Sequence, residues 1–221
     1  MPKTRPPKKR QQRANPLWIV GLVVVAVALV AIIAYANRPI PATTAEALGF
    51  CGQAECGQAN APVTIEIYSD FQCPFCAQAD SILQQLAAPY VQTGKARLVY
   101  RIVAFIGQES VVAAQAALCA GDQNKFWAYA GYLFSHQGAE NSGAFSQARL
   151  VDFAAKLRLD TTAFNACLSS GKYATAVQQG TSLATQRGVT ATPTFFINGQ
   201  RYEGVLSYSQ LAALIDAAQP R

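Results

Sequence analysis

Histidine is nearly absent from this sequence, because His136 is the single one among 221 residues. It follows the predicted helical run AGYLFS, where a cation is favoured by the negative end of the helix dipole. We therefore expect His136 to cap that helix rather than to take part in catalysis. Long internal repeats are also missing, which leaves no sign of a repeat array. About half of the residues are apolar, enough for the core of one ordinary domain with an appendage.

Acidic residues are missing from the first 16 positions, which carry six Lys or Arg residues. From residue 39 onward, eleven Lys or Arg residues face twelve Asp or Glu residues, so the net charge of +6 comes from the N-terminal part. The body of the protein is close to neutral. The charge therefore does not predict binding to nucleic acid.

Charge of either sign is absent from residues 17–36, LWIVGLVVVAVALVAIIAYA. A helix of this length measures roughly 30 Å, which matches the hydrocarbon core of a bilayer. Residues 21–34 are apolar on all sides, unlike a helix at the surface of a globular domain. We predict a transmembrane helix, with the basic tail 1–16 in the cytoplasm and the rest of the chain on the other side. A cleaved signal peptide, which would leave a secreted protein, is the alternative; the length of the apolar run favours a retained anchor.

The part after the apolar run is predicted to start with a linker, residues 37–61, which contains Cys51 and Cys56 and is rich in Pro, Ala, Thr and Gly. A β-branched and aromatic run at residues 63–70 predicts a strand. Apolar positions at helical spacing from Phe75 to Tyr90 predict a helix that begins within the Cys-Pro-Phe-Cys turn.

Later elements complete the pattern of a mixed sheet covered by helices. We predict a strand at residues 96–103, a mostly helical stretch from about 109 to 186, and a hairpin at residues 192–198 followed by RYEG. The segment SYSQLAALIDAA predicts a capped, amphipathic final helix. This order is typical of an α/β layer architecture.

The motif SDFQCPFC, residues 69–76, places Cys73 and Cys76 three positions apart at the start of the predicted helix. A thiolate at a helix N-terminus is stabilised by free backbone N–H groups and by the helix dipole. Cys76 lies one turn further on the same side and can close a disulfide with Cys73. A mixed disulfide at Cys73 could then be resolved by Cys76, the two-step route of thiol–disulfide exchange.

Three other interpretations of this pair stay open from the motif alone. The cysteines could form a structural disulfide, which an exported location permits. Together with Cys51 and Cys56, they have a spacing close to that of a four-cysteine zinc ribbon. They could also be buried free thiols.

Three separated motifs occur in a fixed order along the chain: SDFQCPFC after an APVTI strand, CAGDQNKFWAYAGYLF in the middle and GVTATPTFFINGQ near the end. Together they resemble the DsbA-like branch of the thioredoxin-fold thiol–disulfide oxidoreductases, over residues 58 to 218. The resemblance implies a thioredoxin fold in two parts, residues 62–104 and 187–221. Residues 105–186 would form the inserted helical domain of that family.

The resemblance also implies roles for individual residues. Cys73 would be the attacking cysteine and Cys76 the resolving one. Thr192 and Pro193 would form the cis-proline loop, which pairs with the substrate backbone beside the cysteines. A proline directly before a central strand is otherwise an awkward placement.

The dipeptide between the cysteines, Pro74 and Phe75, would tune the redox poise, and Phe75 is expected to be exposed to substrate. Many relatives carry a carboxylate six residues before the first cysteine, where it serves the proton of the buried thiol. That position is Ile67 here, and the neighbouring Glu66 should face the other side of the sheet. Asp70 is either a substitute for this carboxylate or a turn residue, and both interpretations stay open.

The other four cysteines are predicted to be structural. A disulfide between Cys119 and Cys167 suits an exported protein and occurs in some relatives, and it would contribute on the order of 4 kcal/mol. Two unpaired thiols are the alternative. Cys51 and Cys56 are expected to form a disulfide, with exchange with the Cys73–Cys76 pair and zinc binding as alternatives.

We therefore predict a membrane-tethered oxidoreductase on the extracytoplasmic, periplasmic side, which introduces disulfides into exported proteins without a cofactor or a metal. The resemblance implies a membrane quinone-linked oxidoreductase as the partner that reoxidises it. One alternative is a reductase or isomerase of exported disulfides. An alternative from another class is a zinc-stabilised, membrane-attached binding module that uses Cys51, Cys56, Cys73 and Cys76.

Overall fold

The structure, a computed structural model, describes residues 26–28 and 54–220. The chain divides into two units, Met1–Ile40 and Pro41–Arg221, and the described residues of the first unit are helical. The rest of the predicted transmembrane segment, residues 17–36, lies outside the described residues. Within the two described ranges, no helix has the length and apolar character needed to cross a bilayer.

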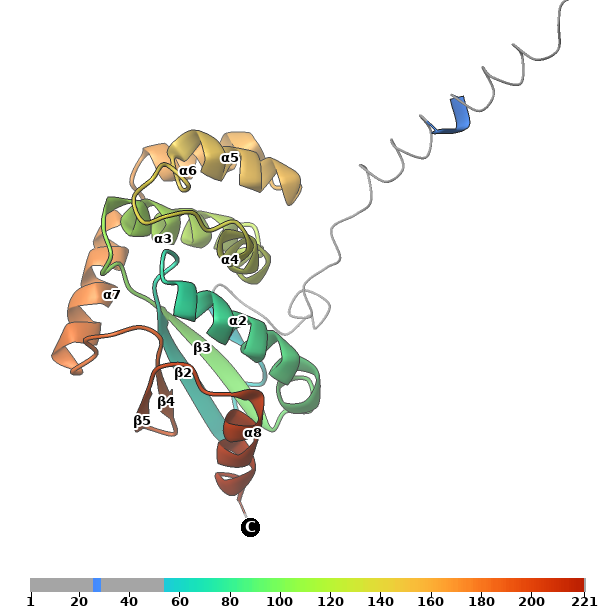
Figure 1. Ribbon diagram of the computed structural model, residues 1–221, viewed down its shortest axis with the longest axis vertical. Helices are drawn as coiled ribbons and strands as arrows, with labels where there is room; N and C mark the ends of the chain where they lie inside the picture. Colours follow the sequence, from blue (N-terminus) through green and yellow to red (C-terminus); the bar gives the residue numbers. More distant parts are fainter. Residues whose placement is uncertain (1–25, 29–53, 221) are drawn as a thin grey trace, which may run out of the picture. The chain divides into compact units, whose positions relative to one another are not determined.

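The second unit is built on a five-stranded sheet with the strand order β1-β3-β2-β4-β5 (Figure 1). Strands β2 and β3 are parallel, and the other neighbouring pairs are antiparallel. The predicted hairpin turns at Asn198 and Gly199, which both have the positive φ that a two-residue hairpin loop requires. The strands are β1 (Glu55–Cys56), β2 (Val63–Ser69), β3 (Ala96–Ile102), β4 (Thr194–Ile197) and β5 (Gln200–Glu203).

Helices cover both faces of this sheet (Figure 1). On one face, Ile65 and Ile67 of β2 are 1% exposed and belong to the main core with α2 (Pro74–Leu86) and α8 (Tyr208–Ala217). On the other face lies α7 (Ala174–Gln186), above a separate and smaller apolar cluster. That cluster consists of Tyr68, Val103, Ala184, Val189 and Phe196.

The segment between β3 and β4 forms a block of helices at the end of the sheet from which α2 starts (Figure 1). A disulfide joins Cys119 to Cys167, the pair that the resemblance implied, with Cα atoms 5.9 Å apart. His136 is the C-cap residue of α4, and its Nδ1 lies 2.8 Å from the Tyr132 carbonyl oxygen, which confirms its predicted capping role. The helices before α7 are α3 (Gln108–Gly121), α4 (Phe126–Ser135), α5 (Gln147–Lys156) and α6 (Thr161–Ser169).

Two elements differ from the predictions. Strand β1 lies within residues 37–61, so the linker interpretation is wrong for Glu55–Cys56, which pair with β3. A two-residue strand is too short to show an alternating pattern. Helix α2 continues into a π-helical turn, Ala87–Val91, around Pro89. Because proline has no N–H to donate, this residue cannot continue the α-helical hydrogen-bond ladder.

Candidate active site

The cysteine pair lies where β2 passes through a tight turn into α2. Strand β2 ends at Ser69, Cys73 is the N-cap residue of α2 with an extended backbone, and Pro74 begins the helix. Proline suits the first helical position, because the N–H group there has no partner within the helix. The Cys73 side chain is therefore placed at the positive end of the α2 dipole.

Cys73 and Cys76 are both free thiols, and they differ in access to solvent. Cys73 is 6% exposed, whereas Cys76 is fully buried. Phe75, between them, is 57% exposed, as the sequence led us to expect. An approaching sulfur can therefore reach Cys73 but not Cys76.

The loop before β4 lies against Cys73. The Thr192–Pro193 peptide bond is cis, and Cys73 Sγ lies 3.3 Å from the Thr192 carbonyl oxygen, to which the protonated form of Cys73 donates a hydrogen bond. The fold thus brings together two pairs of candidate residues that are 119 positions apart in the sequence. The hydroxyl of Thr194 donates to the Ala191 carbonyl at 2.7 Å and holds the other side of the loop.

The two thiols have opposite electrostatic surroundings. A hydrogen bond from the Cys76 thiol lowers the pKa of Cys73 to about 6, and the Thr192 side chain and helix N–H groups assist against the opposing effect of burial. Burial raises the pKa of Cys76, and the neighbouring Cys73 raises it further. At neutral pH, Cys73 is therefore a thiolate and a good leaving group, and Cys76 is a protonated thiol.

Asp70 is the residue that fixes the turn before Cys73. It is fully buried, and its Oδ1 accepts hydrogen bonds from the Gln72 N–H at 2.9 Å and the Ser110 hydroxyl at 2.6 Å. Its Oδ2 accepts from the N–H groups of Phe105 at 2.8 Å and Ile106 at 3.1 Å. Both oxygens are thus saturated, so the structure supports the turn interpretation over the role of a substitute proton carrier.

Gln137 is a further residue of the site, which sequence analysis missed. Its Nε2 donates to the carbonyl oxygens of Phe71 at 2.7 Å and of Cys73 at 3.0 Å. It lies in the segment between α4 and α5, 64 positions from Cys73, so no local pattern could have revealed it. Through this amide, the helical block holds the turn that carries the cysteines.

The strand position expected to hold a carboxylate is apolar, as the sequence indicated. Ile67 is buried in the main core, whereas Glu66 lies on the other face of the sheet. There it accepts from Arg101 Nε at 2.9 Å and Arg187 Nη1 at 3.0 Å. Burial alone would raise the pKa of Glu66, but the hydrogen bonds from Arg187 and Arg101 outweigh it and lower the pKa overall. Glu66 is thus part of an ion-pair network and does not face the cysteines.

The zinc interpretation does not agree with the structure. Cys56 is disulfide-bonded, so it cannot serve as a zinc thiolate beside Cys73 and Cys76. Its predicted partner, Cys51, lies outside the described residues. The proposed four-cysteine set, and the zinc-stabilised binding module that depended on it, is therefore overturned.

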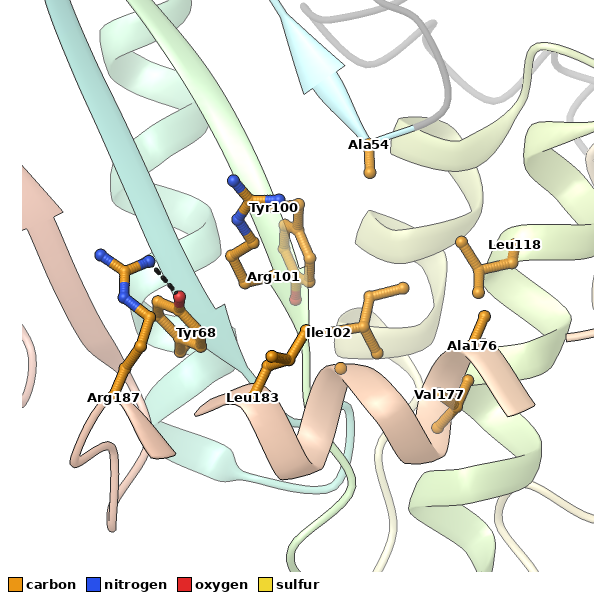
Figure 2. Close-up of a pocket in the computed structure, with 11 residues that line it drawn as sticks. Ala54, Tyr68, Tyr100, Arg101, Ile102, Leu118, Ala176, Val177, Leu183 and Arg187 are labelled. Carbon is orange, nitrogen blue, oxygen red and sulfur yellow. Dashed lines mark hydrogen bonds between the residues drawn. The ribbon is translucent and has the colours of Figure 1, made fainter. Parts of the chain in front are cut away.

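A cavity of about 440 Å³ opens on the face of the sheet that α7 covers, between β3 and α7 (Figure 2). Figure 2 shows Arg187, directly after α7, hydrogen-bonded to the hydroxyl of Tyr68. Ile102 and Leu183 supply apolar parts of the lining. Neither Cys73 nor Cys76 lines this cavity, so it is separate from the cysteine site.

One of the two cysteines has a lowered pKa and the other a raised pKa, and they lie one helical turn apart. Such a pair can alternate between a dithiol and a disulfide. The mixed sheet flanked by helices is a thioredoxin-like fold, and the cysteine pair on it has the chemical character that thiol–disulfide exchange requires. The chain belongs to the thioredoxin family: a family model described as Thioredoxin matches residues 52–217.

Comparisons with individual proteins agree with this assignment. The chain is 26% identical over 171 residues to disulfide bond formation protein D of Bacillus subtilis, covering 75% of this chain and 76% of that protein. It is 27% identical to Mtb DsbA in its oxidised crystal structure, with a TM-score of 0.64 over 75% of this chain and 91% of that one. These similarities confirm the DsbA-like assignment.

Other relatives are much longer proteins that match this chain over one segment. The chain is 34% identical over 164 residues to Na(+)/H(+) antiporter NhaA 1 of Salinispora arenicola, covering 73% of this chain and 24% of the antiporter. The chain thus spans about a quarter of the length of the curated relatives that it matches first. The similarity to these antiporters is limited to one segment of each.

Proposed function

We propose that this chain is an extracytoplasmic disulfide oxidase that introduces disulfides into exported proteins through Cys73 and Cys76. The lowered pKa of Cys73 at the N-terminus of α2 is the observation that carries the proposal. A stabilised thiolate favours the reduced form of the chain, which makes its disulfide a stronger oxidant. The name of the Bacillus subtilis relative, disulfide bond formation protein D, supports the same direction.

The reaction transfers two electrons from a substrate dithiol to the chain. A substrate thiolate attacks Sγ of Cys73, so the Cys73–Cys76 bond breaks and a mixed disulfide forms between the substrate and Cys73. The second substrate thiolate attacks the substrate sulfur of that mixed disulfide, and Cys73 leaves as a thiolate. The substrate gains a disulfide, and the chain becomes the dithiol.

Surrounding residues orient the substrate in this proposal. The cis peptide bond at Pro193 presents the Thr192 backbone beside Cys73, where an extended substrate can pair with it. The exposed ring of Phe75 offers an apolar contact for an unfolded chain. Pro74 and Phe75 also set how the first turn of α2 presents its N–H groups to Cys73, and through this the redox poise.

The N-terminal segment would hold the oxidase at the membrane. Basic residues in 1–16 followed by 20 uncharged residues support an anchor with a cytoplasmic N-terminus. The electrons taken from substrates would then pass from Cys73 and Cys76 to a quinone-linked oxidoreductase in the same membrane. A reporter enzyme that is active only outside the cytoplasm, fused to the C-terminus, should be active, and an inactive reporter would contradict this orientation.

A disulfide-transfer assay tests the activity. The full chain in detergent, with Cys73–Cys76 oxidised, is mixed with a reduced, unfolded protein that has two cysteines. We expect one substrate disulfide for each oxidised chain and none with Cys73→Ser. Reduction of a preformed substrate disulfide by the dithiol chain, with no transfer in the forward direction, would instead make the protein a reductase.

A further inference from the structure

In each round of the proposed reaction, the buried sulfur of Cys76 must gain a proton and later lose it. When a substrate attacks Cys73, Cys76 leaves as a thiolate at a position with no solvent exposure. Burial raises the pKa of Cys76, so this thiolate must take a proton at once. On reoxidation, the same thiol must lose the proton before it can attack. A buried group close to Cys76 is needed for both steps.

Asp80 is placed to serve this need. Asp70 and Asp80 are the two buried acids in the described part of the chain, and Asp70 is saturated by four hydrogen-bond donors. Asp80 lies one turn after Cys76 on the buried face of α2 and is 7% exposed. Side chains four positions apart in a helix are neighbours, with Cβ atoms about 5–6 Å apart.

The carboxylate of Asp80 has little structural support. Its Oδ2 accepts a hydrogen bond from Gln84 Nε2 at 2.7 Å, and no Lys or Arg of residues 54–220 forms a salt bridge with it. Its neighbours on the buried face, such as Ala79 and Leu83, are apolar. A buried carboxylate with one neutral partner is costly, so packing alone would favour an apolar residue here.

Two hydroxyl groups share the interior with Cys76 and Asp80. The hydroxyls of Ser69 and Tyr100 are buried, and neither has a hydrogen bond of normal geometry with another described residue. Burial is the main cause that raises the pKa of Tyr100; the charges of Cys76 and Asp80 raise it further, and the Ser69 side chain lowers it. Ser69 also lowers the pKa of Cys76 against the larger effect of burial. Hydroxyls that both donate and accept can pass a proton between the thiol and the carboxyl group.

We propose that Asp80 is a positioning residue that supplies and removes the proton of Cys76 through the hydroxyls of Ser69 and Tyr100. The inference rests on the proposed function and adds its proton pathway. In the forward step, the electron pair of the broken S–S bond stays on Cys76, the carboxyl group of Asp80 gives up its proton, and water at its exposed edge restores it. On reoxidation, the carboxylate of Asp80 takes the proton of Cys76, whose thiolate then displaces the leaving group from Cys73.

The acid strength of Asp80 suits both directions. Burial raises the pKa of Asp80 to about 6, against the smaller opposing effect of the hydrogen bond from Gln84. A group with a pKa near the working pH exchanges protons most effectively, because both of its forms are populated.

Among the described residues, Asp70 is the other charged group that acts on this pathway, because its charge also raises the pKa of Tyr100. Helix α4 contains no ionisable carboxylate or cation, and the one acid of α8, Asp216, accepts a hydrogen bond from Tyr90 instead. On β3, Arg97 and Arg101 contact Thr64 and Glu66, on the opposite face of the sheet. The titratable groups that face Asp80 are therefore Cys76 on its own helix and Tyr100 on β3.

The test isolates the step in which Cys76 acts. Cys73 of the full chain is loaded with glutathione as a mixed disulfide, and the rate at which Cys76 releases the glutathione is followed from about pH 5 to pH 8. The wild-type rate should rise through about pH 6. Asp80→Asn should lose this inflection and slow the release by about 10²-fold, and Asp80→Glu should recover part of the rate. The matched control Asp216→Asn, which changes an exposed acid of α8, should behave as wild type. A release rate and pH profile of Asp80→Asn equal to those of the wild type would overturn the proposal.

Two further readouts keep the result unambiguous. The pKa of Cys73, titrated through its thiolate absorbance, should be the same in Asp80→Asn, and a change confined to that pKa would contradict the role given to Asp80. If Asp80→Asn does not fold, infrared difference spectra of the wild type should show a carboxyl band that changes on reduction and shifts in Asp80→Glu; its absence would refute the proposal. The direction of substrate oxidation does not enter these readouts. A reductase with the same Asp80 defect would overturn the proposed function alone.

Discussion

Two cysteine pairs of this structure lie at opposite ends of helices. Cys73 caps the N-terminus of α2, where the dipole stabilises a thiolate. Cys119 and Cys167 lie near the C-terminal ends of α3 and α6, where the dipole disfavours one. A carboxylate oxygen of Asp122 also lies 3.6 Å from Cys167 Sγ. In the proposed exchange, Cys73 departs as a stabilised thiolate when the mixed disulfide is resolved, which favours transfer through the first pair. Neither sulfur of the second pair has such stabilisation at its helix end, so that disulfide should persist.

The two pairs also differ in what they connect. Cys73 and Cys76 close a loop within the first turn of one helix, so their bond constrains little of the chain. Cys119 and Cys167 are 48 positions apart and join two helices of the helical block, which restricts the unfolded chain. The position at a helix end, the access to solvent and the length of chain enclosed thus distinguish the pair proposed to exchange from the disulfide that joins two helices.

The sharpest test of this comparison replaces Cys73 in one variant and both Cys119 and Cys167 in another. Cys73→Ser should reduce disulfide transfer to background, because Cys73 is the sulfur that a substrate can reach. The double variant Cys119→Ser/Cys167→Ser should keep wild-type activity at a temperature where it is folded. Both are measured in the transfer assay, and loss of activity in the folded double variant would show that the two pairs are not functionally separate.

The effects of these variants on stability should be the reverse of their effects on activity. Removal of the Cys119–Cys167 disulfide should lower the free energy of unfolding by on the order of 4 kcal/mol, because the unfolded chain regains the freedom of a long loop. Cys73→Ser should change it far less. Denaturant titrations of the oxidised proteins give both values. Equal losses in the two variants would contradict the structural role of the second pair.

The pH dependence of stability should differ between the redox states. In the reduced chain, Cys73 has a pKa of about 6, below the value of about 8.5 for an unfolded cysteine. The unfolded state therefore binds more protons in this window, and the stability of the reduced chain should rise from about pH 6 to 8.5 and be lost as the pH falls through 6. The oxidised chain and reduced Cys73→Ser lack this titration. A reduced wild type whose stability parallels theirs across the window would refute the lowered pKa.

The smallest effect is expected for Gln137, whose side chain connects the helical block to the turn that carries Cys73. Gln137→Leu removes the hydrogen bonds to the carbonyls of Phe71 and Cys73, which should cost about 1–3 kcal/mol of stability. Activity should fall only a few-fold, because the sulfurs and the α2 N-terminus remain. Gln123→Leu, which removes amide contacts to the Asp160 backbone far from the cysteines, is the matched control. An equal loss of transfer activity in both variants would show that Gln137 has no particular effect on the cysteine turn.

Local signals allowed the sequence to predict the main parts of the site. The Cys-Pro-Phe-Cys turn follows a β-branched strand and begins an amphipathic helix, so Cys73 could be placed at a helix N-terminus before any tertiary contact was known. The Asn198-Gly199 turn and the Ser207 cap of α8 are equally local, and the structure contains both. The meeting of Thr192 with Cys73 came from the resemblance and not from any local pattern.

Features that depend on tertiary contacts could not be predicted. Gln137 and Asp80 are ordinary polar residues in the sequence, and their importance comes from what lies next to them in the fold. Asp70 had two interpretations until its four donors, three of them from distant segments, were visible. Strand β1 is defined by its pairing to β3, which a two-residue segment does not reveal by itself.

The reduction potential of the Cys73–Cys76 pair is the most direct test of the central claim. The full chain is equilibrated with glutathione buffers, and the thiols of this pair are quantified separately from those of the other cysteines. We expect a potential of about −120 mV, the value of the strong oxidant DsbA, because the stabilised Cys73 thiolate favours the reduced form. A potential of about −270 mV, the value of thioredoxin, would contradict the claim and identify a reductase.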